Sequence, residues 1–259
     1  MKIKEIMTKG VIFVDKDVDL KYVLKLMKKH SITKIPVVED KKLIGVITDN
    51  IIAVKLGSIR SKGVSPSRFH ASSVIDKNVE ILSPETDIGN ILKTVGEPGP
   101  TMLNVVEGER IIGVITKADL LPLVSSEKKI KEIMNKNIHS VSPDDRVIHA
   151  RRRMIDENIA RLPVMNNGIL LGVISDNEIA FAFAELKKSI SIGKQKHKLD
   201  ELLVNDTMKT PAIWTEADVT IKEAASIMME NNVGSLIIKE NNKVIGIVTR
   251  TDLIKTIQI

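Results

Sequence analysis

The chain has 259 residues, a formal net charge of +6 and no cysteine. This length suffices for two ordinary domains, and the absence of cysteine excludes disulfides and thiolate metal sites. Hydrophobic residues make up 43% of the chain but aromatic residues only 2%, which predicts an aliphatic core. The N-terminal segment interrupts its apolar residues with charges, and no apolar run approaches the roughly 20 residues that span a bilayer. We therefore expect a soluble cytoplasmic protein that does not enter a membrane.

One short sequence motif occurs four times along the chain. Each copy is an apolar run with a central glycine, followed by a hydroxyl residue that opens a helix: LIGVITDNII (43–52), IIGVITKADLL (111–121), LLGVISDNEI (170–179) and VIGIVTRTDL (244–253). Counted from Met7, Ile75, Met134 and Met208, the glycine follows after 38 residues and the hydroxyl after 41, without gaps. This register indicates an internal repeat.

Each repeat predicts the same order of elements. A short entry segment and strand come first, then a helix, then two β-branched runs around a polar turn, and finally a second helix. The first helix carries one apolar stripe, at positions 13, 16 and 20 after the starting residue: Leu20, Val23, Met27; Ile88, Ile91, Val95; Val147, Ala150, Met154; and Ile221, Ala224, Met228. Each unit is therefore predicted as βαββα, and the chain as an α+β protein.

The four units are expected at about residues 1–56, 69–124, 128–184 and 201–257, and we number them 1 to 4. Polar and basic linkers are predicted at 57–68 and 185–200. Odd and even units differ. Units 1 and 3 have a basic residue two positions before a proline. Units 2 and 4 instead have a basic residue and an aspartate after the hydroxyl residue. This alternation suggests that a pair was duplicated, and it predicts two domains, 1–124 and 125–259.

Four βαββα units that each end in this motif resemble the CBS domain family, whose members pair into Bateman modules. The resemblance covers nearly everything except the linkers. It implies two pseudo-twofold pairs of CBS units, and a freestanding regulatory protein that forms a homodimer and signals to an unidentified partner protein. It also implies binding of AMP, ADP, ATP or S-adenosylmethionine in clefts between paired units. The family rarely supplies catalysis, so no enzymatic activity, catalytic residue or catalytic cofactor is expected.

The resemblance also indicates which residues bind the nucleotide. A hydroxyl at the first turn of a helix lies where backbone N–H groups attract a phosphate, and a carboxylate three residues later can accept hydrogen bonds from a ribose diol. The expected binding residues are Thr116, Lys117, Asp119, Thr249, Arg250 and Asp252, with Lys34 and Arg161 for a phosphate tail. The glycines at 113 and 246 are expected to allow close approach of backbone or ligand.

Weaker candidates come from the odd units and from the first strands. They are Thr48, Ser175 and Glu178 after the odd hairpins, and Ile12, Val79, Ile138 and Ile213 beside an adenine. Ile51 stands where a ribose-binding carboxylate is expected. Asp49 and Asp176 replace the base of the even units and oppose a phosphate. We therefore expect two strong sites per chain, in units 2 and 4.

Other interpretations stay open at this point. A Thr-x-x-Asp sequence is close to a capping box, which needs no ligand. The basic balance and the Lys-rich stretch at 187–198 would suit a nucleic-acid-binding protein, although aromatic residues for base stacking are scarce. A ligand-free dimerisation or docking scaffold is a third reading. The five histidines show no metal-ligand spacing, and no P-loop, GxGxxG or GxSxG motif occurs, so no metal site is expected.

Overall fold

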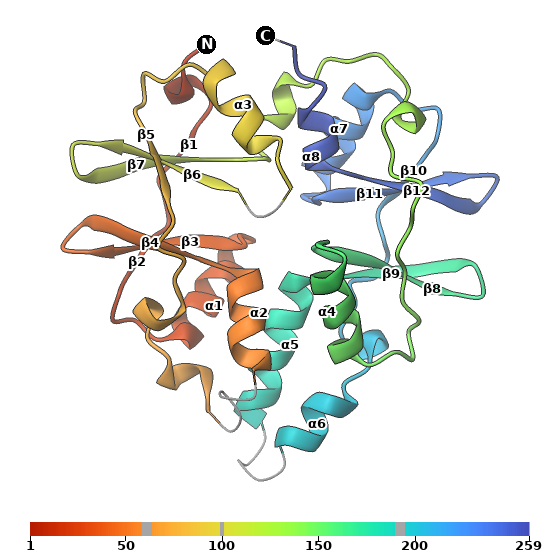
Figure 1. The fold of residues 1–259 in the computed structure, drawn as a ribbon, viewed down its shortest axis with the longest axis horizontal. Coiled ribbons are helices and arrows are strands. Elements are labelled where there is room, and N and C mark those ends of the chain that lie inside the picture. Colours follow the sequence, from red (N-terminus) through yellow and green to blue (C-terminus); the bar gives the residue numbers. More distant parts are fainter. Residues whose placement is uncertain (59–63, 99–100, 190–194, 259) are drawn as a thin grey trace.

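The structure is a computed structural model that describes residues 1–58, 64–98, 101–189 and 195–258, with the side chains of 188–197 left aside. Its four units lie around a flat disc, with units 1 and 2 on one side, units 3 and 4 on the other, and both termini at the same edge (Figure 1). Helices and strands are mixed in every unit, so the α+β class is confirmed.

Units 1 and 2 contain two hairpins and three α-helices. Unit 1 consists of β1 (Thr8–Lys9), β2 (Val14–Asp15), α1 (Leu20–His30), β3 (Lys34–Glu39), β4 (Lys42–Thr48) and α2 (Asp49–Gly57). Unit 2 consists of β5 (Glu80–Leu82), α3 (Gly89–Val95), β6 (Met102–Glu107), β7 (Arg110–Thr116) and a 3-10 turn, η5 (Leu121–Leu123).

Units 3 and 4 repeat this order with small differences. Unit 3 consists of α4 (Val147–Asp156), β8 (Arg161–Asn166), β9 (Ile169–Ser175) and α5 (Asp176–Ser189). Helix α6 (Gln195–Glu201) leads into unit 4, which consists of β10 (Trp214–Glu216), α7 (Ile221–Glu230), β11 (Ser235–Glu240), β12 (Lys243–Thr249) and α8 (Arg250–Ile254).

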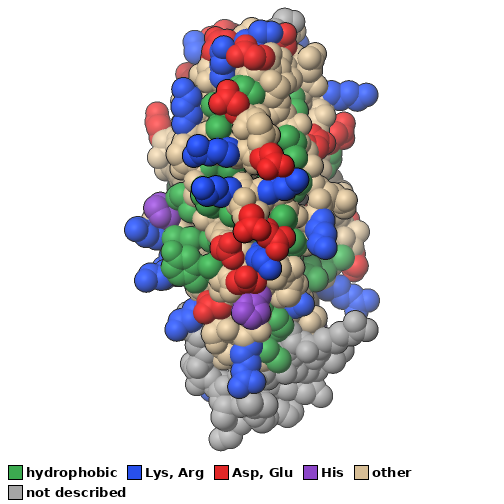
Figure 2. Space-filling view, turned by 90° about the vertical axis from the view of Figure 1, so that its left-hand side faces the viewer, with side chains coloured by type: hydrophobic (Ala, Val, Ile, Leu, Met, Phe, Trp, Pro, Cys, Tyr) green, Lys and Arg blue, Asp and Glu red, His purple; other side chains and the backbone are tan. Residues whose placement is uncertain are grey.

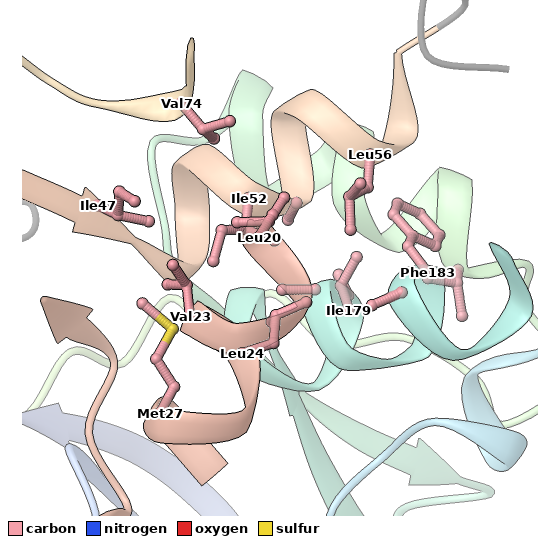
Figure 3. Packing of buried hydrophobic residues seen from close by; sticks show 14 of the residues in the cluster. Leu20, Val23, Leu24, Met27, Ile47, Ile52, Leu56, Val74, Ile179 and Phe183 are labelled. Carbon is pink, nitrogen blue, oxygen red and sulfur yellow. The ribbon is translucent and has the colours of Figure 1, made fainter. Parts of the chain in front are cut away.

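The apolar stripe of each first helix is buried, as its spacing predicts. All twelve stripe residues are at most 3% exposed. In α1 the stripe begins after the N-cap Asp19, whose carboxylate accepts a hydrogen bond from the Tyr22 N–H, and α7 begins after the capping box of Thr220 and Glu223. Figure 3 shows Leu20, Val23 and Met27 of α1 turned toward the core.

The starting residue of each repeat packs on the glycine of the paired unit. A Cβ added to Gly113 would lie 2.3 Å from the sulfur of Met7, and one added to Gly246 would lie 2.5 Å from the sulfur of Met134. Gly45 and Gly172 likewise meet Ile75 and Met208. The regular spacing of the glycines therefore reflects an exchange of entry segments between paired units. At positions 113 and 246 a methionine side chain makes the close approach that we expected of backbone or ligand.

Backbone pairing follows the same exchange. Strand β1, in the entry segment of unit 1, pairs antiparallel with β7 of unit 2. In the reverse direction, Asp76 in the entry segment of unit 2 forms a bridge with Val46 of unit 1. The corresponding bridges in the other half join Asn135 to Ile247 and Val173 to Lys209. One seven-stranded sheet contains the hairpins of units 1 and 2, because β4 also pairs with β7. Six of its strands follow the order β2-β3-β4-β7-β6-β5, and the seventh, β1, pairs with β7 off this path.

The largest core crosses from one half of the chain to the other. Helices α2 and α5 pack together, and one hydrophobic cluster contains buried residues of units 1 and 3. In Figure 3, Ile52 and Leu56 of α2 face Ile179 and Phe183 of α5. Units 2 and 4 also meet, because Ile254 of α8 packs in the core of unit 2. The hydrophobic cores therefore do not separate into one for each pair of units.

Three of the predicted elements are wrong. In the described part of unit 3, the predicted first strand is reduced to a single bridge between Val141 and Val164. Unit 2 has no second α-helix after Thr116: residues 117–120 form turns that lead into η5. Pro122 explains this difference, because it lacks an N–H and disfavours helical backbone at the preceding residue. The second linker is largely helical, since α5 continues to Ser189 and α6 starts at Gln195, and Lys187 is only 3% exposed.

The surface at one edge of the disc carries both signs of charge. Figure 2 shows Lys and Arg side chains interspersed with Asp and Glu on this face. Exposed ion pairs such as Lys16–Glu39 at 3.0 Å and Lys42–Glu109 at 3.2 Å contribute to the pattern. This face has no continuous basic strip of the kind that follows a nucleic-acid backbone. Within the described ranges, no helix has both the length and the apolar character needed to cross a membrane.

Candidate nucleotide-binding site

A cavity of about 1930 Å³ occupies the centre of the disc, and all four units line it. Three of the four hydroxyl residues that follow the hairpins line this cavity, namely Thr116, Ser175 and Thr249, whereas the turn at Thr48 reaches it only through Asp49 and Asn50. The fourth turn, at Thr48, lines a separate pocket of about 170 Å³ together with Ile51 and Val79. The units are therefore not equivalent as binding sites.

The cleft of unit 2 is built from the turn at Thr116 and from the entry segment of unit 1. The backbone N–H and the hydroxyl of Thr116 donate to Oδ2 of Asp119 at 2.7 and 2.8 Å. The hydroxyl of Thr8 donates to Oδ1 of the same carboxylate at 2.5 Å. Ile12 and Pro36 line the cavity beside this turn. We call this arrangement the unit-2 cleft.

The cleft of unit 4 has the same plan. The backbone N–H and the hydroxyl of Thr249 donate to Oδ2 of Asp252 at 2.8 and 2.7 Å, which forms a capping box at the start of α8. Unit 3 supplies Asn135 and His139 to the wall. Ile138, which we expected beside an adenine, does not line the cavity, whereas its sequence neighbours Asn137 and His139 do. We call this arrangement the unit-4 cleft.

The capping interpretation and the ligand interpretation are compatible. In both clefts the cap engages Oδ2 of the aspartate. Oδ1 of Asp252 has no hydrogen bond among the described residues, whereas Oδ1 of Asp119 accepts one from the hydroxyl of Thr8. Because a carboxylate oxygen can accept two hydrogen bonds, the capping contacts leave acceptor capacity in both even clefts.

The odd-unit turns differ in chemistry. In unit 3, the backbone N–H of Ser175 donates to Glu178 at 3.0 Å and its hydroxyl donates to the same oxygen. Ile213 of unit 4 lines the cavity there. In unit 1, the Thr48 hydroxyl accepts from the Ile51 N–H at 3.2 Å and caps α2, and Ile51 stands where the even units have their aspartate. The Thr48 turn is thus a helix cap beside a small pocket.

Several Lys and Arg side chains line the central cavity, and four of them, one from each unit, act on one another electrostatically. We call Lys34, Lys117, Arg161 and Arg250 the central cation cluster. Lys34 Nζ donates to the Thr101 carbonyl of unit 2 at 2.7 Å. Arg161 lies against Gly234 of unit 4, where an added Cβ would be 2.4 Å from Nη1. Both odd-unit bases therefore reach the even unit of their own pair.

Burial and mutual repulsion weaken the charged state of this cluster. Burial, followed by the repulsion of Lys117, Arg250 and Arg161 and opposed by Asp49, lowers the pKa of Lys34 to about 8. Burial and then the repulsion of Arg161 lower the pKa of Lys117 to about 8 and that of Arg250 to about 10. The Nε of Arg250 is also buried and has no hydrogen-bond partner among the described residues. An anion in the cavity would relieve each of these costs.

Two aspartates of the odd units face the same region. Burial, together with the repulsion of Asp176, raises the pKa of Asp49 to about 6. Asp176 is 5% exposed and pairs with Arg151 at 2.6 Å. The Nδ2 of Asn50 also donates to Asp176, from unit 1. These acids balance the cations on the odd side of the cavity, where the phosphate of a ligand is least favoured.

Sequence reasoning missed four residues that shape the site: Thr8, Asn50, Arg151 and Thr251. Asn50 and Thr251 share one place, 43 residues after the starting residue of their repeats, but they differ in chemistry, and Thr8 and Arg151 lie at two other places. The part of the chain that the structure describes contains no group of three or more His, Cys, Asp or Glu residues that could hold a metal ion.

Comparison with known proteins identifies relatives over almost the full length. An uncharacterized 33.4 kDa protein in the ribosomal RNA operon of Thermofilum pendens is 24% identical over 249 residues, which cover 90% of this chain and 83% of that protein. Protein MJ1225 of Methanocaldococcus jannaschii is 23% identical over 279 residues, covering 98% of this chain and 97% of that protein. The similarity therefore extends over most of both relatives and most of this chain.

Solved structures share the arrangement of all four units. The crystal structure of MJ1225 has a TM-score of 0.84 at 22% identity and covers 98% of this chain and 99% of that chain. A conserved protein of Pyrococcus horikoshii has a TM-score of 0.61 at 17% identity, with both chains fully covered. The CBS domain model matches residues 3–56, 71–126, 130–185 and 204–259, close to the four predicted units. The chain therefore belongs to the CBS domain family.

Proposed function

We propose that this protein binds adenosine-containing nucleotides in the unit-2 and unit-4 clefts and regulates a partner protein according to their occupancy. The observation that carries the proposal is the central cation cluster, to which every unit contributes one base. Asp119 and Asp252 lie at the two clefts with acceptor capacity left for a ribose diol. The phosphate of a nucleotide would then point inward, toward the cations.

The size of the cavities supports this choice of clefts. Pockets for small molecules usually measure about 300–1,000 Å³. The central cavity of about 1930 Å³ has room for more than one nucleotide, whereas the pocket of about 170 Å³ at Thr48 is too small for one. Unit 3 has an open turn, but Asp49 and Asp176 stand near its phosphate position. We therefore propose two strong sites per chain.

The charge of the cavity ranks the candidate ligands. AMP, ADP and ATP bring phosphates that neutralise buried cations. S-adenosylmethionine carries a sulfonium and an ammonium group, so we propose that it binds more weakly than the three nucleotides. The proposed role is binding and regulation, because the carboxylates of Asp119 and Asp252 each accept hydrogen bonds from the backbone N–H and the hydroxyl of their own turn.

Thermal unfolding of the full chain tests this function. We expect AMP, ADP or ATP at about a hundred times its dissociation constant to add roughly 2.7 kcal/mol of stability per site, which raises the midpoint by several degrees. GTP serves as the base-specificity control. Asp119→Ala and Asp252→Ala should each remove part of the rise, whereas the exposed Asp144→Ala should leave it intact. No rise with any adenosine compound would contradict the proposal.

The regulated partner and the homodimer are further parts of this proposal. Light scattering after size-exclusion chromatography measures the assembly state directly, with and without nucleotide. A monomer under both conditions would contradict the homodimer without affecting the binding sites.

A further inference from the structure

Lys117 belongs to unit 2 but extends into unit 4. It follows Thr116 in sequence, so we expected it to serve the unit-2 cleft. Instead its Nζ donates to the hydroxyl of Thr251 at 2.7 Å, in the residue next to Asp252. A second hydrogen bond, to the Glu97 carbonyl at 2.6 Å, supports the side chain from its own unit. The ammonium group therefore lies at the turn that forms the unit-4 cleft.

Arg250 stands in the reverse relation to unit 2. It follows Thr249 in unit 4 but lines the same central cavity as Thr116 and Asp119, and Asp119 is the carboxylate whose attraction opposes the lowering of its pKa. Its Nε is buried without a hydrogen-bond partner in the described ranges, so one donor is left unsatisfied within the cavity wall. An unsatisfied buried donor costs roughly 1–3 kcal/mol, and an anion in the cavity that contacts the guanidinium would offset this cost.

The electrostatics of the two bases are reciprocal. Burial lowers the pKa of Lys117, and the opposing carboxylate is Asp252 of the other pair of units. Burial also lowers the pKa of Arg250, and the opposing carboxylate is Asp119. Arg161 repels both bases. Each even-unit base is therefore coupled to the carboxylate of the opposite even unit.

We infer that the two even clefts exchange their phosphate-binding bases, so that Arg250 serves the unit-2 cleft and Lys117 serves the unit-4 cleft. The inference rests on the proposed function and adds to it the assignment of each base to a ligand. Each cleft is then complete only when both halves of the chain are in place. The ribose-binding aspartate comes from one pair of units and the phosphate-binding base comes from the other.

The exchange has a consequence for regulation. A nucleotide in the unit-2 cleft holds Arg250, which is attached directly to the turn of the unit-4 cleft. A nucleotide in the unit-4 cleft holds Lys117 in the same way. Occupancy of one cleft therefore acts on the geometry of the other, and the two ligands clamp the halves of the disc together.

Two single-cleft backgrounds in the full chain test the assignment. Asp252→Ala removes the ribose-binding carboxylate of the unit-4 cleft, so that only the unit-2 cleft binds nucleotide. Asp119→Ala does the reverse, so that only the unit-4 cleft binds. Arg250→Ala or Lys117→Ala is then added to each background, and dissociation constants of AMP, ADP, ATP and adenosine are measured by titration calorimetry. Circular dichroism checks folding, and Arg250→Gln replaces Arg250→Ala where the smaller side chain does not fold.

We expect a crossed pattern. In the Asp252→Ala background, Arg250→Ala weakens nucleotide binding about tenfold, the effect of losing one charge-assisted hydrogen bond, and Lys117→Ala changes it less than about twofold. In the Asp119→Ala background the two effects are reversed. Adenosine binding stays unchanged in both, because adenosine has no phosphate.

Other results overturn the inference. An uncrossed pattern, in which each base affects its own cleft, contradicts the exchange. Equal weakening by both bases in both backgrounds means one shared phosphate position and also contradicts it. In these two cases the proposed function still holds, because the wild-type chain binds nucleotide. Absence of binding to the wild-type chain overturns the proposed function itself, and the exchange with it.

Discussion

Arg151 donates from Nη1 to Oδ1 of Asp176 at 2.6 Å, and the two side chains are only 8% and 7% exposed. Oδ2 of Asp176 accepts from Asn50 of α2 at 2.9 Å. Asp176 begins α5, so this network joins units 1 and 3 where α2 and α5 pack. The two halves of the disc are thus connected by a buried polar network as well as by their shared core.

Removing one partner of this pair should be strongly destabilising. Asp176→Ala leaves the Arg151 charge buried and unpaired, so we expect it to lower the free energy of unfolding by about 3–5 kcal/mol. Urea denaturation measures the change. The control is Asp156→Ala, which removes the exposed pair with Arg152 at 3.7 Å and should cost less than about 1 kcal/mol. Similar losses in both variants would contradict this view of the network.

Asp49 should make stability depend on pH. Its folded-state pKa of about 6 lies above the value of the unfolded chain, near 4, so the folded state binds more protons between these values. The wild-type chain therefore gains stability from this group as the pH falls through that window. Asp49→Asn should be more stable than wild type at pH 7, by on the order of 2–3 kcal/mol, and the difference should vanish below about pH 4. A difference that is constant from pH 4 to 7 would contradict this prediction.

Nucleotide affinity should fall above about pH 8. The pKa of Lys34 and that of Lys117 are both lowered to about 8, and a bound phosphate would raise them. Binding is then strongest below pH 8, where both lysines are charged, and weakens by up to roughly tenfold per pH unit per lysine above it. Titration calorimetry between pH 6.5 and 9.5 measures this, with Lys34→Arg as the control that stays charged. Affinity independent of pH would show that neither lysine meets the phosphate.

A hairpin glycine and a helix glycine should respond to alanine with opposite signs. A Cβ at Gly172 would lie 2.6 Å from the backbone carbonyl of Lys209, which accepts from the Val173 N–H at 3.0 Å. Gly172→Ala should therefore break the hydrogen bond between Val173 and Lys209 and lower the free energy of unfolding by about 1–3 kcal/mol. Gly89, in the first turn of α3, has nothing within 4 Å, and Gly89→Ala should stabilise the chain by roughly 0.5–1 kcal/mol. Thermal unfolding distinguishes these opposite signs.

Features with a local cause were visible in the sequence. The buried stripe of α1, with Leu20, Val23 and Met27, follows from helical periodicity, and the hairpin of β3 and β4 follows from β-branched runs around a polar turn. The absence of a helix after Thr116 has a local cause too, because Pro122 was present in the sequence. The family followed from the repeat, because one register kept over four copies is hard to reach by chance.

Contacts between repeats required the folded chain. The packing of Met7 on Gly113 and the hydrogen bond of Lys117 to Thr251 each join residues far apart in sequence. Four nearly equivalent units can pair in several ways, and every pairing satisfies the same hydrophobic periodicity. Which base meets which cleft depends on the relative position of two halves, and that position is set by the α2–α5 core and the Arg151–Asp176 pair. The chemistry of each cleft can thus be read along the chain, but its partners come from packing over long distances, which no local pattern encodes.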